Sequence, residues 1–283
     1  MKTLITRIIG MYLNFLGIVA PRIAGKKGFL IFCRPFRSPL NSKQLEFLNS
    51  GEKFTIEHNE NSIQGYKWGN GDKKLLFIHG WQSHTYRWKA YIESLSKDEY
   101  TIYALDAPGH GLSAGNFLSV PVYSDLIEKL IHQIGEVDTA IAHSIGSFSL
   151  LYTFYRKNDL KVNNLILMAA PGEAKDFVDV FRTTLKLTDR TIRLITDHFM
   201  QRYRVTPDFF SAIKFADSVN AKSLLIHDEY DDEAPYQYAV QLSSALKNSR
   251  LITTKGLGHN LKSNAVVKYV NDFIASQAQE VTL

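Results

Sequence analysis

The stretch at residues 139–146, Thr-Ala-Ile-Ala-His-Ser-Ile-Gly, decides the fold class because it places a serine between a short apolar run and a helical pattern. A serine at such a strand-to-helix turn exposes its hydroxyl, and the N-terminus of the following helix is directed at it. The turn is tight and requires small residues two positions before and two positions after the serine. Ala142 and Gly146 stand at these positions around Ser144. We therefore predict a nucleophilic serine at the edge of a β-sheet.

Short runs with β-strand character alternate with helical patterns on both sides of this turn, from residue 54 onward. The predicted strands are Phe54–Glu57, Ser62–Trp68, Leu75–Ile78, Tyr100–Leu105, Thr139–Ala142, Leu165–Met168, Ser223–Ile226 and Leu251–Thr254. The predicted helices are Tyr86–Leu95, Val122–Ile134, Ile145–Tyr155, Tyr236–Leu246 and Ala265–Ile274. This alternation implies right-handed crossovers and a mostly parallel, doubly wound, eight-stranded sheet of the α/β class. The first two strands are close enough in sequence to pair as an antiparallel edge.

Polar or glycine-rich groups follow five of the predicted strands. In an open parallel sheet, binding sites lie beyond the carboxyl ends of the strands, so these groups are expected at one edge. A serine nucleophile needs a neighbouring base, and the base needs an orienting acid. His259 and Asp231 follow Ser144 in the chain, in the order Ser, Asp, His. The groups are His79-Gly80-Trp81, Asp106–Gly111, His143–Gly146, His227–Asp231 and Gly258-His259.

Residues 171–221 interrupt the alternation of strands and helices. Their apolar residues recur at helical spacing, and no strand is predicted between Pro171 and Ala221. We expect this segment to form a helical cap insertion. The helical spacing of its aromatic residues indicates that most of them pack against neighbouring side chains. The candidate substrate contacts are His84 and four of these aromatic residues, Phe177, Phe181, Phe199 and Phe209.

Composition and charge narrow the class of protein. With 283 residues, of which 45% are apolar, the chain accommodates one α/β domain at residues 46–283. A single cysteine, Cys33, excludes an internal disulfide framework, and the nine histidines show no metal-binding spacing. No cofactor and no metal are therefore expected. Residues 1–43 carry eight Lys and Arg and no Asp or Glu, whereas the remaining 240 residues have a net charge of −3.

The N-terminal arm, residues 1–45, begins with an amphipathic helical pattern. One face holds Ile5, Ile8, Tyr12, Phe15 and Val19, and the narrow opposite stripe holds Thr3, Arg7, Gly10, Asn14 and Gly17. Three interpretations are open: a helix docked on the body, an interfacial helix anchored by the basic cluster, and a secretory signal without an A-x-A-like cleavage site. The arm contains no nucleic-acid-binding module, so no nucleic acid partner is expected. We expect a cytoplasmic protein whose arm docks on the body, with weak peripheral membrane binding.

The five groups, in this order and spacing, resemble the α/β-hydrolase fold superfamily over roughly residues 54–278. The chain departs from the usual elbow in having Ala142 where most members have glycine. The resemblance implies that Asp231 is the triad acid, because His227–Asp231 keeps the His-Gly-x-x-Asp spacing with Asp228 in place of the glycine. Two oxyanion donors, the backbone N–H groups of Trp81 and Ile145, are also implied by the resemblance.

These residues lead to the expectation of a serine hydrolase that cleaves a small-molecule carboxylic ester or thioester, with catalytic residues Ser144, Asp231 and His259. A serine at the elbow argues against the related dehalogenases and epoxide hydrolases, which use aspartate. Three alternatives remain open: a proline-type aminopeptidase, an acyltransferase, and a ligand receptor that keeps the fold without turnover. The aminopeptidase would need carboxylates to hold an amine, for which the cap offers Glu173, Asp176 and Asp179.

Overall fold

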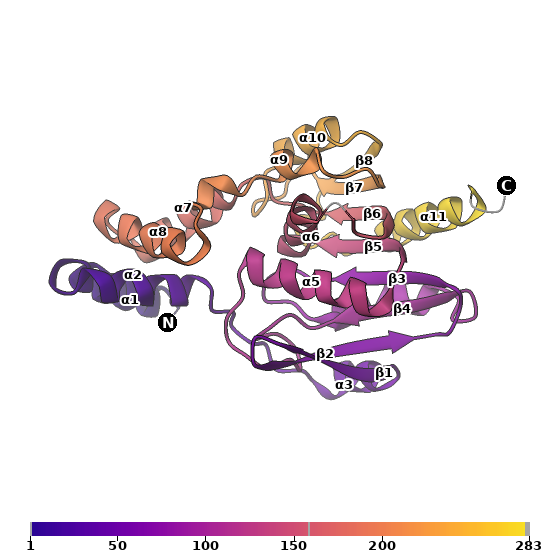
Figure 1. Cartoon of the computed structure of the whole chain (residues 1–283), viewed down its shortest axis with the longest axis horizontal. Coiled ribbons are helices and arrows are strands. Elements are labelled where there is room, and N and C mark those ends of the chain that lie inside the picture. Colours follow the sequence, from indigo (N-terminus) through magenta and orange to yellow (C-terminus); the bar gives the residue numbers. More distant parts are fainter. Residues whose placement is uncertain (1, 158, 281–283) are drawn as a thin grey trace. The chain divides into compact units, whose positions relative to one another are not determined.

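The computed structural model describes residues 2–157 and 159–280, and these fall into two compact units. The sheet unit comprises Pro35–Gly172 and Ala212–Leu283, and the helical unit comprises Met1–Arg34 and Glu173–Ser211 (Figure 1). These boundaries differ from those expected from the sequence. Residues 35–45 of the expected arm and residues 212–221 of the expected cap belong to the sheet unit.

The sheet has eight strands in the order β1-β2-β4-β3-β5-β6-β7-β8. β2 pairs antiparallel with both β1 and β4, and every other pair is parallel. The strands are β1 (Glu52–His58), β2 (Asn61–Trp68), β3 (Lys73–Ile78), β4 (Tyr100–Leu105), β5 (Val137–His143), β6 (Val162–Met168), β7 (Lys222–Asp228) and β8 (Ser249–Thr254). This confirms the predicted doubly wound α/β sheet of the α/β-hydrolase type, including the antiparallel edge.

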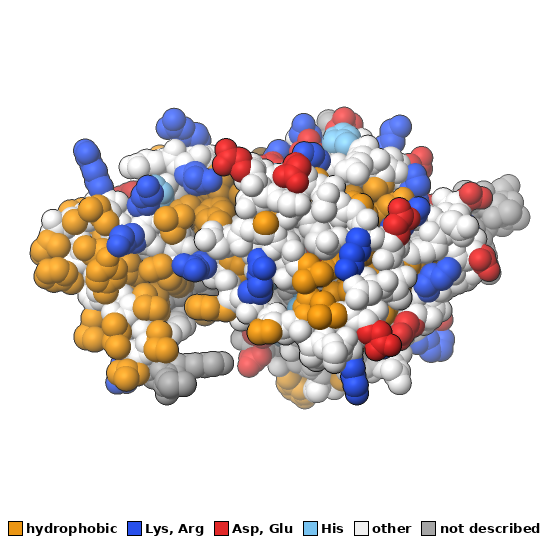
Figure 2. All heavy atoms as spheres, turned by 90° about the horizontal axis from the view of Figure 1, so that it is seen from below, with side chains coloured by type: hydrophobic (Ala, Val, Ile, Leu, Met, Phe, Trp, Pro, Cys, Tyr) orange, Lys and Arg blue, Asp and Glu red, His pale blue; other side chains and the backbone are white. Residues whose placement is uncertain are grey.

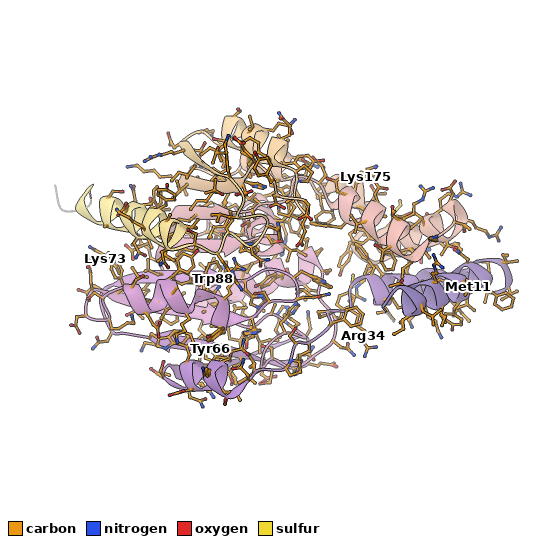
Figure 3. All side chains as sticks on the ribbon, turned by 180° about the vertical axis from the view of Figure 1, so that it is seen from behind. Met11, Arg34, Tyr66, Lys73, Trp88 and Lys175 are labelled. Atoms are coloured by element: carbon orange, nitrogen blue, oxygen red, sulfur yellow. The ribbon has the colours of Figure 1, made fainter. Side chains whose placement is uncertain are left out.

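Helices cover both faces of the sheet. Leu75 and Phe77 of β3 are fully buried in a cluster with Trp88 and Val270, whereas Leu76 and Ile78 are buried on the opposite face. Trp88 and Tyr66 are among the largest fully buried side chains (Figure 3). The helices of this unit are α3 (Ser42–Asn49), η1 (Thr85–Trp88), α4 (Lys89–Ser94), α5 (Val120–Ile134), α6 (Ile145–Arg156), α9 (Ala212–Ala216), α10 (Tyr236–Ala245) and α11 (Asn264–Glu280).

One helix, α3, is absent from the sequence prediction, although a local signal for it is present. The Asn41 side chain accepts a hydrogen bond from the Gln44 backbone N–H, and the Gln44 side chain accepts one from the Asn41 N–H. This reciprocal capping box marks a helix start. The helix is short, and it packs through Phe47 and Leu48 on the sheet unit, so tertiary contacts stabilise it more than its own periodicity.

The helical unit combines the N-terminal arm with the segment between β6 and β7. α1 (Lys2–Val19) and α2 (Pro21–Phe32) pack on α7 (Ala174–Leu185) and α8 (Asp189–Tyr203), which η2 (Pro207–Phe209) follows. Phe29 of α2 is fully buried against the rings of Phe199 and Tyr203. Within residues 2–157 and 159–280, no helix has the length and hydropathy required to cross a membrane.

The arm packs within the helical unit through glycines and Asn14, and not through the apolar face of its amphipathic pattern. Gly10 and Gly25 lie against backbone, where a Cβ would meet the carbonyl oxygens of Leu185 and Leu194 at 1.7 and 2.4 Å. The Asn14 amide bridges the α7–α8 connection, donating to the Lys186 carbonyl at 3.0 Å and accepting from a backbone N–H. The expected apolar face is exposed instead, because only the small-residue stripe allows the helices this close approach.

Candidate active site

Ser144 lies at the end of β5, on the first bend into α6. Its backbone has φ 54° and ψ −128°, a strained conformation for a residue other than glycine, and its N–H donates to the Met168 carbonyl at 2.9 Å. Two residues later, a Cβ on Gly146 would lie 2.6 Å from the His79 carbonyl oxygen. The close approach of two backbones therefore requires glycine at position 146, and the turn directs the Ser144 hydroxyl out of the sheet edge.

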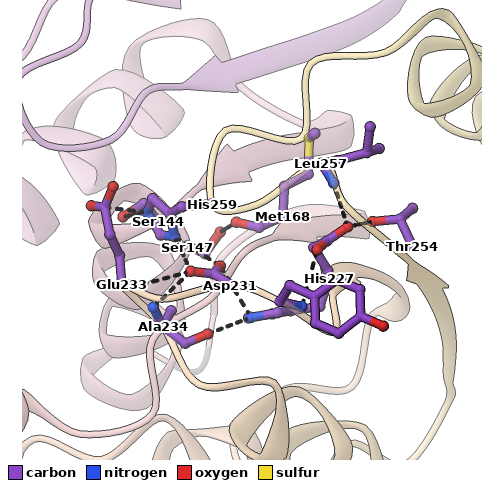
Figure 4. A network of polar contacts seen from close by, with 12 residues as sticks. Ser144, Ser147, Met168, His227, Asp231, Glu233, Ala234, Thr254, Leu257 and His259 are labelled. Carbon is purple, nitrogen blue, oxygen red and sulfur yellow. Dashed lines mark hydrogen bonds and ion pairs between the residues drawn. The ribbon is translucent and has the colours of Figure 1, made fainter.

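The structure brings Ser144, His259 and Asp231 into one hydrogen-bonded chain (Figure 4). His259 Nε2 lies 2.8 Å from Ser144 Oγ, and His259 Nδ1 lies 2.9 Å from Asp231 Oδ2. With Nδ1 donating to the carboxylate, Nε2 is the acceptor that faces the serine hydroxyl. This is the geometry in which an imidazole removes a proton from a serine.

Asp231 is held as a buried carboxylate. Burial alone would raise its pKa, but hydrogen bonds from His227, His259 and the Ala234 N–H hold the pKa of this carboxyl below its usual range. Its Oδ1 accepts the backbone N–H groups of Glu233 and Ala234, each at 2.9 Å. Asp231 therefore stays ionised and fixed in orientation beside the His259 ring.

The neighbouring Asp228 does not contact His259 in the described structure but holds the loop after β8. Its carboxylate accepts the Thr254 hydroxyl at 2.7 Å and the backbone N–H groups of Gly256 and Leu257 at 3.1 and 2.9 Å. These contacts tie the end of β7 to the loop that carries His259. Asp232, which is next to Asp231 in the chain, is exposed. Of the three aspartates, Asp231 alone lies within hydrogen-bond distance of His259 in the described structure.

Two buried histidines, His79 and His143, connect the turns around the site. His79 accepts the Ala107 N–H at 2.9 Å through Nε2 and donates to the Gly80 carbonyl through Nδ1, and burial lowers its pKa to about 3. His143 Nε2 lies 2.8 Å from the His259 carbonyl, and burial lowers its pKa well below the ordinary value. Both rings are neutral at pH 7, and they join neighbouring turns at the sheet edge.

The loop after β3 passes directly beside the nucleophile. A Cβ on Gly80 would lie 2.9 Å from the Cβ of Ser144, so this position also requires glycine. Trp81 follows in the chain, and Ile145 is the first residue of α6. The first N–H groups of a helix have no acceptor within the helix, which leaves the Ile145 N–H available to a ligand.

Ser144 and His259 open into a pocket of about 510 Å³ within the sheet unit. Its charged residues are Arg87, Lys262 and Glu233, and the Glu233 carboxylate lies 3.9 Å from His259 Nε2. The His84 ring also lines it, with a buried Nδ1 that has no hydrogen-bond partner among the described residues. The other lining residues are Ser38, Gln44, Trp81, Gln82, Ser83, Tyr86, His143 and Asn260.

The sequence did not identify Arg87, Lys262 and Glu233 as pocket residues, because an isolated charged residue belongs to no recognisable motif. Glu233 could have been identified from the sequence as a site residue, since it lies two positions after Asp231 in the same loop. Arg87 lies in η1, which overlaps the predicted helix Tyr86–Leu95. The sequence assigned this helix no role beyond the α/β pattern. Its place in the pocket depends on the loop of His259, which is distant in the chain.

The predicted aromatic contacts lie in the helical unit and not among the pocket residues. Phe181 packs on Phe32 at 5.1 Å between ring centroids, and Phe199 packs on Phe29 at 5.9 Å. Phe209 contacts Phe210 at 5.3 Å, and Phe177 lies in α7. Their contact with a substrate stays a prediction. No group of three or more His, Cys, Asp and Glu in the described ranges is arranged to hold a metal ion.

Comparisons with known proteins agree with this fold. The profile of a family described as "Serine aminopeptidase, S33" matches residues 69–257. The dihydrolipoyllysine-residue acetyltransferase component of the acetoin cleaving system of Cupriavidus necator is 31% identical over 81 residues, which are 28% of this chain and only 21% of that protein.

Several solved structures superpose on this chain over most of their length. A bacterial membrane phospholipase A superposes with a TM-score of 0.65 at 15% identity, covering 84% of this chain and 90% of that one. Est1E of Butyrivibrio proteoclasticus, solved with ferulic acid, has a TM-score of 0.63 at 18% identity, covering 80% and 99%. The thioesterase domain of the curacin biosynthetic pathway has a TM-score of 0.59 at 16% identity, covering 81% and 99%. At these identities, the likeness establishes the fold.

Proposed function

Because the chain belongs to the serine aminopeptidase family of α/β hydrolases, we propose that it is a serine hydrolase that cleaves a carboxylic ester or thioester through an acyl-enzyme. The observation that carries the proposal is the hydrogen-bonded chain from Ser144 through His259 to Asp231, at 2.8 and 2.9 Å. The neighbouring structures with phospholipase and thioesterase titles support an acyl substrate.

In the first half-reaction, His259 Nε2 takes the proton of the Ser144 hydroxyl as Oγ attacks the carbonyl carbon. The tetrahedral oxyanion accepts hydrogen bonds from the N–H groups of Trp81 and Ile145, each worth about 2.7–4 kcal/mol in comparable sites. Asp231 stabilises the imidazolium without taking its proton. His259 then protonates the departing alkoxide or thiolate, which leaves Ser144 acylated. Water, deprotonated by the same ring, releases the acid and restores the serine.

The test is covalent labelling together with turnover. The wild-type protein is expected to react with a fluorophosphonate at Ser144, located by peptide mass spectrometry, and to hydrolyse p-nitrophenyl esters. Aminoacyl anilides serve as the parallel substrate, because an aminopeptidase would use the Glu233 carboxylate to hold the free amine. Faster turnover of anilides than of esters would favour the aminopeptidase, and labelling without turnover of either would identify a receptor.

The pocket charges indicate an anionic group on the substrate. The Arg87 guanidinium donates to the Asn260 carbonyl at 3.2 Å, yet its buried Nε has no partner in the described residues. Burial lowers the Arg87 pKa to about 10, so it stays charged at pH 7. No carboxylate pairs with Arg87 or Lys262 within the described part of the chain, and an anion in the pocket would supply the missing partner.

Arg87→Met is therefore expected to lower kcat/KM about 10- to 100-fold for an ester with a terminal carboxylate, and less than about threefold for its methyl-capped analogue. A hydrogen bond to a charged group is lost only with the anionic substrate. Steady-state kinetics on the two esters measure the ratio, and Arg250→Met, at an exposed position of β8, is the control. Equal losses on both esters would show that Arg87 only positions the His259 loop.

A further inference from the structure

We propose that the helical unit binds an anionic lipid surface through the exposed face of α1. This apolar face consists of eight side chains that are each more than 40% exposed: Leu4, Ile5, Ile8, Met11, Tyr12, Phe15, Ile18 and Val19. At 100° per residue, these positions form one continuous arc, and the buried Gly10, Leu13 and Gly17 lie on the opposite side. Figure 2 shows hydrophobic side chains gathered at the left of the view.

The way α1 packs within its own unit is typical of helices in lipid. Helices in water pack large apolar side chains against each other and expose polar ones. Here α1 meets α7 and α8 through glycines, at Gly10 and Gly17, and its large apolar residues face outward. Close approach through small residues with large apolar residues outside is the packing found where lipid is the solvent. A face of this size is unusual on a protein surface that meets only water.

The net charge of the helical unit favours anionic lipid as the partner of this apolar face. The helical unit carries thirteen Lys and Arg against six Asp and Glu, a net charge of +7, whereas the sheet unit has a net charge of −2. Lys27 lies at the border of the apolar face, with its Nζ 2.7 Å from the Tyr12 hydroxyl, and Arg22 and Lys26 are exposed on the same helix. Lysine at such a border reaches headgroups while its stem stays on apolar surface.

A second copy of the chain is a poorer occupant. A two-fold dimer through this face would place the same patch on both sides of the interface, and therefore bring two units of net charge +7 together. Anionic headgroups instead neutralise the charge while acyl chains receive the apolar side chains. The structure thus favours an in-plane helix at the level of the headgroups.

The experiment is sedimentation of the full-length protein with sucrose-loaded vesicles of phosphatidylcholine alone or mixed with phosphatidylglycerol. Wild type is expected to bind the mixed vesicles more tightly, and NaCl is expected to weaken this preference. Phe15→Glu with Ile18→Glu should reduce binding about a hundredfold or more. Tyr269→Glu with Asn248→Glu adds the same charge to exposed positions of the sheet unit and should leave binding unchanged.

The basic residues are tested in the same way. Lys26→Gln with Lys27→Gln should weaken binding to the mixed vesicles about tenfold or more and leave binding to neutral vesicles unchanged. Lys247→Gln with Lys268→Gln, which removes two exposed lysines from the sheet unit, is the matched control. Circular dichroism and the melting temperature of each variant verify its folding.

Three results would overturn the proposal. Wild type that stays in the supernatant with mixed vesicles would exclude lipid binding, and equal binding of the Phe15/Ile18 variant would exclude this face. A lipid-free dimer that the same variant converts to monomer would identify a second copy as the occupant. Because sedimentation requires no turnover, its outcome is independent of the proposed hydrolase activity.

Discussion

Ser144→Ala is expected to lower kcat for ester hydrolysis by about 10⁴-fold or more, because the acyl-enzyme cannot form without Oγ. The free energy of unfolding should change by less than about 1 kcal/mol. The substitution removes one partly accessible oxygen, and alanine meets the same backbone strain at φ 54° as serine does. Initial rates on a p-nitrophenyl ester and urea unfolding measure the two quantities.

The matched control is Ser147→Ala, one turn further along α6. Ser147 is fully buried, and its Oγ donates a hydrogen bond to the Met168 carbonyl at 3.4 Å (Figure 4). This variant should keep turnover within about threefold of wild type. Wild-type-like turnover by a folded Ser144→Ala protein would remove Ser144 from the mechanism. Equal losses in both variants would point to a change in the elbow itself.

Asp231→Asn is expected to lower kcat by about 10³- to 10⁴-fold with a small change in melting temperature. The amide oxygen still accepts the N–H groups of Glu233 and Ala234, but the amide NH₂ then faces His259 Nδ1. Nδ1 must become the acceptor, so Nε2 carries the proton and cannot accept one from Ser144. The histidine keeps its place and loses the required tautomer.

Asp228→Asn separates a catalytic from a structural carboxylate. One oxygen of Asp228 accepts from both Thr254 and Leu257, so an amide nitrogen there loses two hydrogen bonds. We expect a loss of about 1–3 kcal/mol in the free energy of unfolding and a smaller effect on kcat than at Asp231. Asp232→Asn, at an exposed position, should change neither. If Asp228→Asn has the largest kcat loss at unchanged stability, the assignment of Asp231 is wrong.

The sheet could be predicted because its signals are local. Apart from the edge strand β8, the strands of the parallel part are buried on both faces, which leaves apolar runs such as Leu75–Ile78 that are recognisable one at a time. The helices α5 and α6 show their period within a few turns. By contrast, α3 is eight residues long and depends on the contacts of Phe47 and Leu48 with the sheet unit. A periodicity analysis has too few turns in which to detect it.

Some residues of the candidate site could likewise be predicted from local signals, and others could not. Ser144, Asp231 and His259 were found because each lies in the turn or loop that follows a strand, and strand ends meet at one edge whatever the packing of the helices. Arg87 and Lys262 were not found. They meet the site because η1 and the His259 loop pack side by side, and no short-range pattern encodes that contact. The charge of the pocket is therefore a tertiary property.

The sequence by itself determined the positions of the strands, the elbow at Ser144 and the amphipathic character of α1, since all three arise from residues close together in the chain. Only the tertiary structure decided which face of α1 is buried. Hydrophobic periodicity predicts burial of the apolar face, but Gly10 and Gly17 allow a close approach of α1 to Leu185 and Thr191 that larger side chains would prevent. Steric fit between helices distant in sequence overrides the hydrophobic pattern there, and the apolar face of α1 is left on the surface.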